Sequence, residues 1–327
     1  MTQPLQTHFA PRRYAPLPLF AGFSACGDDV QTFLQGQLTN DVKALSPTHW
    51  QRTGYCTPKG RLMANFLQWQ MGPQTIGHLM PLELLEPISK RLRMFVLRSK
   101  VVFERLDNPL LAIGLWGEPQ DGFGQGQQCI NLSGTEQGPW LLAETTCPVL
   151  GPRCWLIAEA SQLKNILETL SACEKMPEAA WLFSEIQTGQ AWIWKSTQEA
   201  FVPQMINFEI TGGVSFTKGC YPGQEVVARS QYLGKLKRRS FRADLEGEIS
   251  QAQALALCGQ DIWAQGFESE PCGKVAAAAP RFNAQGHVET GAALLVECTL
   301  EAWQGGNLHL GSLQGPALTA KALPYGF

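Results

Sequence analysis

The sequence of 327 residues lacks most of the short patterns that identify metal sites and common enzyme classes. The closest two of its ten cysteines are Cys147 and Cys154, so it has no Cys-x-x-Cys pair, which excludes the usual local zinc and ferredoxin patterns. It also has no Gly-x-Gly-x-x-Gly fingerprint after a strand, no Walker A loop and no His-Glu-x-x-His helix. The five histidines are scattered without ligand-like spacing. We therefore predict no metal site.

The sequence also has little net charge and no apolar run near its first residues. The formal net charge is -2, so no overall field draws the protein towards nucleic acid or a membrane surface. Residues 1–20 carry four prolines and no apolar run, which predicts neither an export signal nor a membrane span. In a chain without an export signal, we expect the cysteines to be reduced and mostly buried. These features favour a cytoplasmic monomer.

What is present is an alternation of helix-like and strand-like segments without a long linker. Apolar residues at helical spacing predict helices at 30–38, 82–97, 162–170 and 179–193. Residues 55–69 are typical of a hairpin around a turn at 57–60. The stretch 114–140 is rich in glycine and glutamine and is expected to be a surface loop.

The texture of the sequence changes near residue 236. Beyond it, short apolar stretches alternate with glycine, as in a small antiparallel barrel or sandwich. The chain is also long enough for two or three subdomains. We therefore predict an α+β region over residues 1–235 and a C-terminal β domain over residues 236–327.

The densest pattern of reactive and turn-forming residues is the segment 218–225, Lys-Gly-Cys-Tyr-Pro-Gly-Gln-Glu. Its Tyr-Pro-Gly part predicts a tight turn, in which Pro222 presets φ and Gly223 is free to take a positive φ. A helix is expected just after the turn. A thiol beside a helix N-terminus and Lys218 forms the thiolate more readily than a free cysteine, so Cys220 is a candidate reactive thiol. The alternative is a partly buried structural cysteine.

Two groups of basic residues have an ambiguous meaning. Each group is either a solvated surface or a docking patch for RNA, a polyglutamate tail or a partner protein. Neither is interleaved with enough aromatic residues to resemble a single-strand platform. The groups are Lys90, Arg91, Arg93, Arg98 and Lys100, and Lys235, Lys237, Arg238 and Arg239.

Several blocks of the sequence together resemble a known superfamily. They are Phe-Leu-Gln-Gly-Gln-Leu-Thr-Asn-Asp-Val at 33–42, a Pro-Lys-Gly turn within 56–63, Phe-Val-Leu-Arg-Ser-Lys-Val at 95–101, Trp-Leu-x-x-x-Ile-x-x-Gly-x-x-x-Ile at 181–193, Phe-Val-Pro-Gln at 201–204, and Gly-Gly-Val-Ser-Phe at 212–216 before the segment 218–225. This pattern is similar to the superfamily of the glycine-cleavage T-protein, an aminomethyltransferase. Within it, the chain resembles the YgfZ family of folate-binding proteins, described as tRNA-modifying and as iron–sulfur cluster accessories.

The resemblance implies a fold and a set of folate contacts. The fold is α+β, with two interleaved ferredoxin-like subdomains and a C-terminal antiparallel β-barrel around a central channel that accepts folate. Two family tryptophans are associated with folate; one matches Trp181 and the other falls at Phe20. The resemblance also implies folate contacts for Asn65, Gln204 and Arg229. On its own, Trp181 could equally be an aromatic residue of a helix core.

One departure from the transferase relatives bears on activity. Those relatives use an aspartate to steer tetrahydrofolate, but the corresponding stretch here, residues 61–67, has no acidic residue. Asn65 can donate and accept hydrogen bonds, but it cannot supply the charge or take up a proton. Conversely, the T-protein relatives lack the cysteine of the segment 218–225. These two differences favour a folate-regulated thiol protein over a one-carbon transferase.

We predict a folate-binding accessory protein, without turnover of its own, that supports iron–sulfur enzymes, including those that thiolate tRNA. Cys220 would be the working thiol, Lys218 would stabilise its anion, and Tyr221 and Glu225 would shape the pocket. The ligand would be tetrahydrofolate or a derivative. Two alternatives remain: a tetrahydrofolate-dependent aminomethyl- or methyltransferase, and a tRNA-binding module without folate chemistry.

Overall fold

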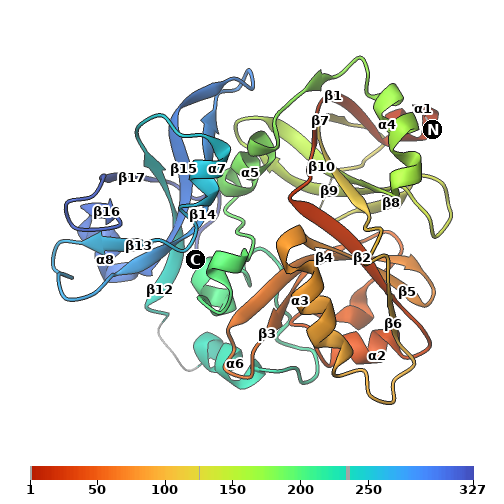
Figure 1. Cartoon of the computed structure of the whole chain (residues 1–327), viewed down its shortest axis with the longest axis horizontal. Helices are drawn as coiled ribbons and strands as arrows, with labels where there is room; N and C mark the ends of the chain where they lie inside the picture. The colour runs from red at the N-terminus through yellow and green to blue at the C-terminus, as the bar shows by residue number, and fades with distance from the viewer. Residues whose placement is uncertain (1, 125, 233–235) are drawn as a thin grey trace.

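The computed structural model describes residues 2–124, 126–232 and 236–327 as three β-sheets with helices around and between them (Figure 1). Sheet I has the strand order β3-β4-β5-β2-β6. Sheet II has the order β11-β1-β7-β10-β9-β8, and sheet III has the order β16-β13-β14-β15-β12-β17. The architecture is therefore a mixed α/β one, built on three separate sheets.

The elements have the following bounds. Sheet I contains β2 (Phe20–Cys26), β3 (Gln51–Cys56), β4 (Leu62–Gly72), β5 (Thr75–Pro81) and β6 (Val102–Glu104). Sheet II contains β1 (Phe9–Pro16), β7 (Leu111–Pro119), β8 (Cys129–Asn131), β9 (Trp140–Cys147), β10 (Gly151–Ala158) and β11 (Glu174–Lys175). Sheet III contains β12 (Arg238–Leu245), β13 (Asp261–Ala264), β14 (Gly273–Phe282), β15 (Val288–Thr299), β16 (Leu308–Leu310) and β17 (Leu318–Lys321). The α-helices are α1 (Thr2–His8), α2 (Val30–Gln35), α3 (Leu82–Arg93), α4 (Leu163–Thr169), α5 (Glu178–Gln187), α6 (Gln224–Tyr232), α7 (Gln251–Leu255) and α8 (Leu300–Gly305).

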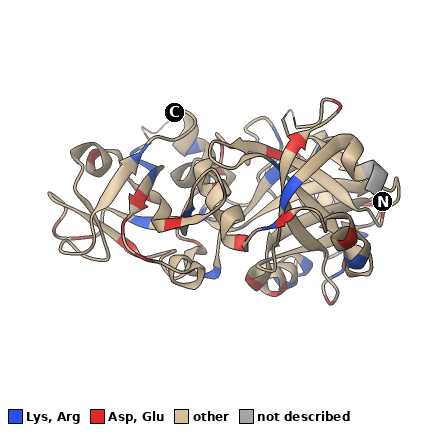
Figure 2. Ribbon diagram, turned by 90° about the horizontal axis from the view of Figure 1, so that it is seen from above, with Lys and Arg blue, Asp and Glu red and all other residues tan. Residues whose placement is uncertain are grey.

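The predicted helices at 30–38, 82–97 and 162–170 are confirmed as α2, α3 and α4, each somewhat shorter than expected. The hairpin is confirmed by the antiparallel pair β3–β4 around the turn at 57–60. Among the described helices, none combines the length and apolar character that a membrane crossing needs. Charged residues of both signs are interspersed along the ribbon, in keeping with the balanced net charge (Figure 2).

The predicted surface loop at 114–140 is wrong in part, because β7 extends to residue 119 and β8 occupies residues 129–131. Two glycines that suggested a loop instead allow close packing within β7. A Cβ on Gly114 would lie 2.2 Å from the ring of Trp181, and one on Gly117 would lie 2.1 Å from the carbonyl oxygen of Ala10. Glycine in a strand interior often marks such a close approach, which a pattern of residue types cannot distinguish from a turn.

The predicted helix at 179–193 ends early, because α5 stops at Gln187. Gly189 has a φ of +72°, the left-handed conformation that commonly terminates a helix. The backbone after it pairs with Asn65, whose side chain bonds to the carbonyl of Ala191 and the amide of Ile193. Residues 179–187 are all buried, since α5 packs between sheets II and III, against β1, β14 and β15 (Figure 1).

Sheet III is nearly closed into a barrel. Its two end strands approach each other through an isolated bridge between His309 and Ala317. The long pair β14–β15 carries a run of buried alanines, which lets α5 and α7 lie close to the sheet. The predicted boundary after residue 235 lies beside residues 233–235, which are outside the described part of the chain.

Candidate functional site

A hollow of about 550 Å³, called the polar cavity below, lies among residues from several elements. It is bounded by β3, β9, the segment after α5, the loops around Gln127 and Thr211, and Tyr325 beyond sheet III. A volume of this size is typical of small-ligand sites. Its wall carries charged, hydrogen-bonding and aromatic side chains: Trp50, Arg52, Glu144, Thr188 and Gln190.

Two arginines and two glutamates form a buried charge cluster at this wall: Arg52, Glu144, Arg153 and Glu185. Their side chains are at most 3% exposed. Arg52 Nη2 donates to Glu144 and Gln190 and lies 3.4 Å from Glu185 Oε2. Arg153 Nη1 donates to Glu185, and its Nη2 lies 3.8 Å from Glu144 Oε2. Each charge therefore faces two opposite charges.

Strand register assembles this cluster. Arg153 on β10 stands directly opposite Glu144 on β9. Two indoles complete the hydrogen bonds of the carboxylates, with Trp155 Nε1 3.2 Å from Glu144 Oε1 and Trp192 Nε1 2.9 Å from Glu185 Oε2. Burial opposes the charge of Arg153, but the two carboxylates outweigh it and raise the pKa of its guanidinium. Buried charges are costly, so a closed cluster at a cavity wall points to a functional site.

The two predicted folate aromatics, Phe20 and Trp181, are brought together by Trp155. The ring centroids are 5.2 Å apart for Phe20–Trp155 and 4.5 Å apart for Trp155–Trp181. Trp181 is fully buried, and its Nε1 has no hydrogen-bond partner among the described residues. Neither ring lines the polar cavity. Arg153 links Trp181 to the polar cavity. The Arg153 guanidinium lies 4.9 Å from the Trp181 ring centroid and donates at 2.9 Å to Thr188, which lines the cavity.

The other three predicted folate contacts do not line the polar cavity either. Asn65 is buried, and its side chain forms two 2.8 Å hydrogen bonds to the backbone after α5. Gln204 is buried and donates to the carbonyl of Val227 at 2.8 Å, so it anchors α6. Arg229 is exposed on α6. For Asn65 and Gln204, these bonds describe a structural role.

The segment 218–225 forms the turn and helix start that its sequence predicts. Gly223 has a φ of +82°, and α6 begins at the next residue. A Cβ on Gly223 would lie 2.4 Å from the carbonyl oxygen of Thr57 and 2.6 Å from the amide nitrogen of Gly60. Two turns that are far apart in the sequence therefore pack backbone against backbone. Cys220 is exposed just before α6, and Glu225 is exposed in its first turn.

Lys218 is buried, and its ammonium group is already occupied. Its Nζ donates to the carbonyl oxygens of Gln35, at 2.6 Å, and Leu38, and it lies 5.1 Å from the ring centroid of Tyr221. Burial lowers the pKa of Lys218 to about 8, although the carboxylate of Asp41 acts in the opposite direction. Burial also raises the pKa of Tyr221. The predicted lysine thus contacts the predicted tyrosine and the end of α2, beside an exposed thiol.

The two basic groups differ in their surroundings. In the first, Lys90, Arg91 and Arg93 lie in the last turn of α3, where they suit the helix dipole. Lys100 pairs with Asp28 at 3.0 Å on the surface. In the second group, Arg238 is partly buried and pairs with Glu297 at 2.6 Å, Arg239 is buried and pairs with Glu209, and Lys237 is exposed. Lys235 lies outside the described residues.

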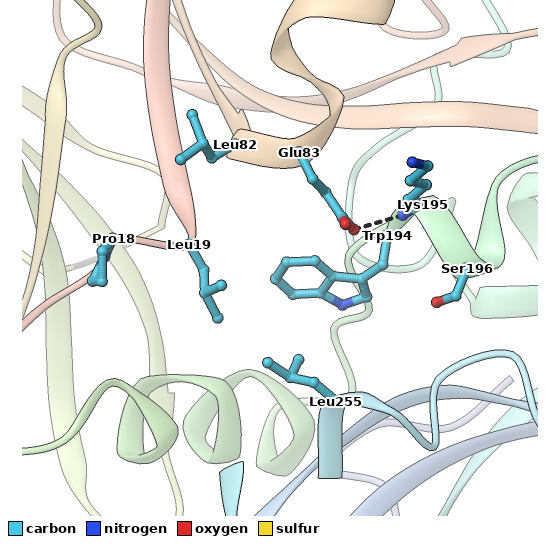
Figure 3. A pocket seen from close by; sticks show the side chains of 8 residues that line it. All are labelled: Pro18, Leu19, Leu82, Glu83, Trp194, Lys195, Ser196 and Leu255. Carbon is cyan, nitrogen blue, oxygen red and sulfur yellow. Dashed lines mark hydrogen bonds between the residues drawn. The ribbon is translucent and has the colours of Figure 1, made fainter. Parts of the chain in front are cut away.

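A second hollow, the apolar groove, has about 610 Å³ and lies between the start of β2, the start of α3 and α7. Figure 3 shows the side chains of Leu19 and Leu255 on either side of the Trp194 indole, with Glu83 above it. The Glu83 carboxylate accepts the backbone amide of Lys195 at 2.7 Å. Since its walls are mostly aliphatic, this groove suits an apolar group better than a polar heterocycle with charged ends.

Sequence reasoning missed the buried charge cluster and Gln190. Its members come from β3, β9, β10 and α5, so no local motif contains them. A signal was available in two places, since Glu144 and Arg153 interrupt the apolar strands Trp140–Cys147 and Gly151–Ala158. In the described part of the chain, no three His, Cys, Asp or Glu side chains gather as a metal site would require.

Comparison with known proteins places the chain in a family. No family model matches it. A protein of Colwellia psychrerythraea named tRNA-modifying protein YgfZ is 31% identical over 227 residues, which is 68% of each chain. Proteins of the same name match from Yersinia pseudotuberculosis, at 30% identity over 77% of this chain and 76% of the relative, and from Vibrio atlanticus, at 29% over 67% and 65%.

The fold has a solved counterpart. The aminomethyltransferase T of the glycine cleavage system from Bartonella henselae superimposes with a TM-score of 0.69. The superposition covers 99% of this chain and 88% of that chain, at 11% identity, so it shows the likeness of the fold alone. The chain belongs to the family of proteins named tRNA-modifying protein YgfZ.

Proposed function

We propose that the protein binds tetrahydrofolate, or a derivative of it, in the polar cavity and thereby supports tRNA modification. The name of its relatives refers to tRNA modification, and its fold is that of a folate-type aminomethyltransferase. The observation that carries the proposal is the buried charge cluster at the cavity wall, where Arg52 and Glu144 both face the hollow. Such a cluster is expensive to bury, so its position beside a cavity favours ligand recognition over stability.

The side chains of the polar cavity fit the chemistry of a folate. A pterin presents adjacent N–H donors and a carbonyl, which suit the Glu144 carboxylate and the Gln190 amide. The glutamate end of a folate is anionic and suits the positive charge of Arg52. Among the described residues, the hydrogen bonds from Arg52 all start from its Nη2, so its other nitrogens would be the ones to meet the ligand. Trp50 offers an aromatic wall. The unpartnered Nε1 of Trp181 is one further donor in the layer behind this wall.

The proposed role is binding without carbon transfer. Asn65 lies in the stretch that corresponds to the acidic one of the transferase relatives, and its amide is bonded to the backbone at Ala191 and Ile193. No acidic residue occurs within residues 61–67, so that stretch offers no group to hold a proton during transfer. Folate in the cavity would instead regulate or stabilise the protein.

The reactive group in this proposal is the exposed thiol of Cys220, which would act on iron–sulfur enzymes, including those that thiolate tRNA. Lys218 and Tyr221 hold the segment against α2, and Glu225 is free to contact a partner. A single cysteine cannot hold a cluster alone, so its partner or a small thiol would supply the other ligands. The proposal also retains two ferredoxin-like subdomains within residues 1–235 and a barrel domain over 236–327, with the cavity at their junction.

Titration with tetrahydrofolate, followed by tryptophan fluorescence, tests the binding. We expect saturable quenching in the wild type and at least tenfold weaker binding in Glu144→Gln, which keeps the shape of the side chain but removes its charge. Trp50→Phe should lose a large part of the signal, because this ring lines the cavity. Trp181→Phe should weaken binding less, since its ring lies one layer behind.

The matched control is Glu289→Gln, a change at an exposed glutamate of β15. It should bind tetrahydrofolate as the wild type does. Absence of quenching in the wild type would overturn the folate assignment. Equal affinity in the wild type and Glu144→Gln would move the ligand away from the polar cavity.

A further inference from the structure

The segment 322–327 crosses from sheet III to the polar cavity. It follows β17, and Pro324 and Tyr325 form part of the cavity wall. Figure 1 shows this end of the described chain in the middle of the molecule, between sheet III and the other two sheets. Among the described residues, none forms a backbone–backbone hydrogen bond with 322–327. Side chains therefore hold this segment in place.

The first anchor is Tyr325, which is half-buried. Its hydroxyl donates to the carbonyl oxygen of Gly189 at 2.7 Å and accepts a hydrogen bond from Asn207 Nδ2 at 3.4 Å. Burial raises the pKa of Tyr325 to about 12, so its hydroxyl remains a donor at neutral pH. Both partners belong to loops that follow α5 and the 3₁₀ turn Pro203–Ile206, not to sheet III.

Gly189 leaves room for Tyr325 because it has no side chain. A Cβ at Gly189 would lie 2.5 Å from the hydroxyl oxygen of Tyr325 and 2.7 Å from its ring. The φ of +72° already favours glycine at this position. The same residue therefore ends α5 and leaves room for the Tyr325 ring. Gly189 does not itself line the polar cavity, although Thr188 and Gln190 on either side of it do.

The second anchor is Phe327, which remains 57% exposed. Its ring centroid lies 5.1 Å from the guanidinium carbon of Arg239 and 5.6 Å from the ring centroid of Phe241. Arg239 is in turn held by Glu209 and by the carbonyl of Gln204 at 3.2 Å. Between these two anchors and β17, Ala322 and Pro324 are exposed. Leu323, between β17 and Tyr325, is partly buried and packs against the hydrophobic core. The segment is thus held by three side chains and, among the described residues, by no backbone ladder.

We propose that residues 322–327 form a strap that closes and opens the polar cavity, with Tyr325 as both its latch and a wall residue in contact with the bound ligand. The identity of that ligand as a folate rests on the proposed function. Opening requires the loss of the side-chain contacts of Leu323, Tyr325 and Phe327, but no backbone ladder has to break. Segments held by few buried contacts are those that open locally. Closure would slow the escape of a ligand from beside Arg52 and Glu144.

Fluorine NMR of protein labelled with 3-fluorotyrosine tests the strap without any ligand. The chain has five tyrosines, and the Tyr325 resonance is the one that disappears in Tyr325→Phe. We expect this resonance to show exchange between two environments in the free protein, with relaxation dispersion on the microsecond-to-millisecond scale. Gly189→Ala should shift it to the open environment. A single sharp resonance without dispersion in the free protein would overturn the strap.

Dissociation of tetrahydrofolate, measured by stopped-flow fluorescence, tests the latch. Tyr325→Phe keeps the ring but loses the bond to Gly189, and it should release tetrahydrofolate about threefold faster. Tyr325→Ala and Gly189→Ala should each accelerate release at least tenfold, the second without altering a lining residue. The control Tyr232→Phe changes a tyrosine that is 68% exposed on α6 and should leave the rate unchanged.

The fluorine NMR and the release experiment together distinguish a failure of the strap from a failure of the proposed function. Unchanged release in all three strap variants overturns the latch, even if folate binds as proposed. If the wild type does not bind tetrahydrofolate, the proposed function fails, and the fluorine signal alone then decides the strap. Exchange at Tyr325 supports it in that case, and its absence overturns it.

Discussion

The polar cavity and the segment around Cys220 hold their charges in different ways. In the cavity, two arginines and two glutamates from four elements neutralise one another, with side chains at most 3% exposed. In the segment 218–225, a single buried ammonium donates to carbonyl oxygens and lies over an aromatic ring, with the carboxylate of Asp41 acting on it as well, and the neighbouring thiol is exposed. The charges of the first site are closed off from solvent, whereas the second site exposes its thiol.

This difference separates recognition from reactivity. A pre-formed charge cluster can exchange hydrogen bonds with a ligand without moving far, which suits selective binding. An exposed thiol on a rigid turn is accessible to a partner molecule, which suits chemistry on something that arrives from outside. The following substitutions test this contrast, beginning with the one expected to lower the free energy of unfolding most.

The largest loss is expected in the polar cavity. Glu185→Ala leaves Arg153 and Arg52 with fewer opposite charges and removes the acceptor of the Trp192 indole. Breaking a buried pair by removing one partner typically costs about 3–5 kcal/mol. We expect the free energy of unfolding, measured in urea at pH 7, to fall by about that amount.

A surface ion pair in sheet II, which also carries Glu144 and Arg153, provides the control. Arg13 and Glu174 lie 3.0 Å apart, with side chains 22% and 52% exposed. Because water screens such pairs, Glu174→Ala should cost less than about 1 kcal/mol. Equal losses in the two variants would contradict the idea that the cavity cluster differs from ordinary surface ion pairs.

A smaller, pH-dependent effect is expected at Lys218. Its pKa falls from 10.5 to about 8 in the folded protein, so between these values the unfolded chain binds a proton that the folded one does not. Stability from this group therefore rises with pH across the window from about 8 to 10.5. The stability of the wild type relative to Lys218→Met should grow by about 1–3 kcal/mol across that window and stay constant below it.

Urea unfolding of both proteins at pH 7, 8.5 and 10 measures this difference. Comparing the two proteins cancels the titration of other lysines, tyrosines and cysteines. A difference that shrinks with rising pH would show that Lys218 is held chiefly as a charged group, in the manner of the arginines of the polar cavity.

The smallest effect on stability is expected at Cys220. Because the side chain is exposed, Cys220→Ala should change the free energy of unfolding by less than about 0.5 kcal/mol. Tetrahydrofolate binding should also be unchanged, whereas restoration of tRNA thiolation in cells lacking the protein should be lost. Cys26→Ala, at another partly exposed cysteine, is the matched control and should restore thiolation. Full restoration by Cys220→Ala would place the chemistry elsewhere.

Local patterns predicted the elements that local forces stabilise. The turn at Gly223, the start of α6 and helices α2, α3 and α4 follow from turn chemistry and apolar spacing. The same reasoning failed at β7, where glycines serve close packing, and beyond Gln187, where Gly189 and the Asn65 amide redirect the backbone. In both places, a contact with a residue far away in the sequence overrides the local preference.

The family, the turn that presents Cys220 and the absence of an acid within residues 61–67 can all be inferred from the sequence, because each rests on continuous blocks of residues. Which groups face the polar cavity depends on the folded structure. Strand register sets Arg153 opposite Glu144, packing brings Arg52 to both glutamates, and Gly189 makes room for a tyrosine 136 residues away. Burial and long-range pairing do not appear in a local pattern, since they depend on which surfaces of the folded chain meet.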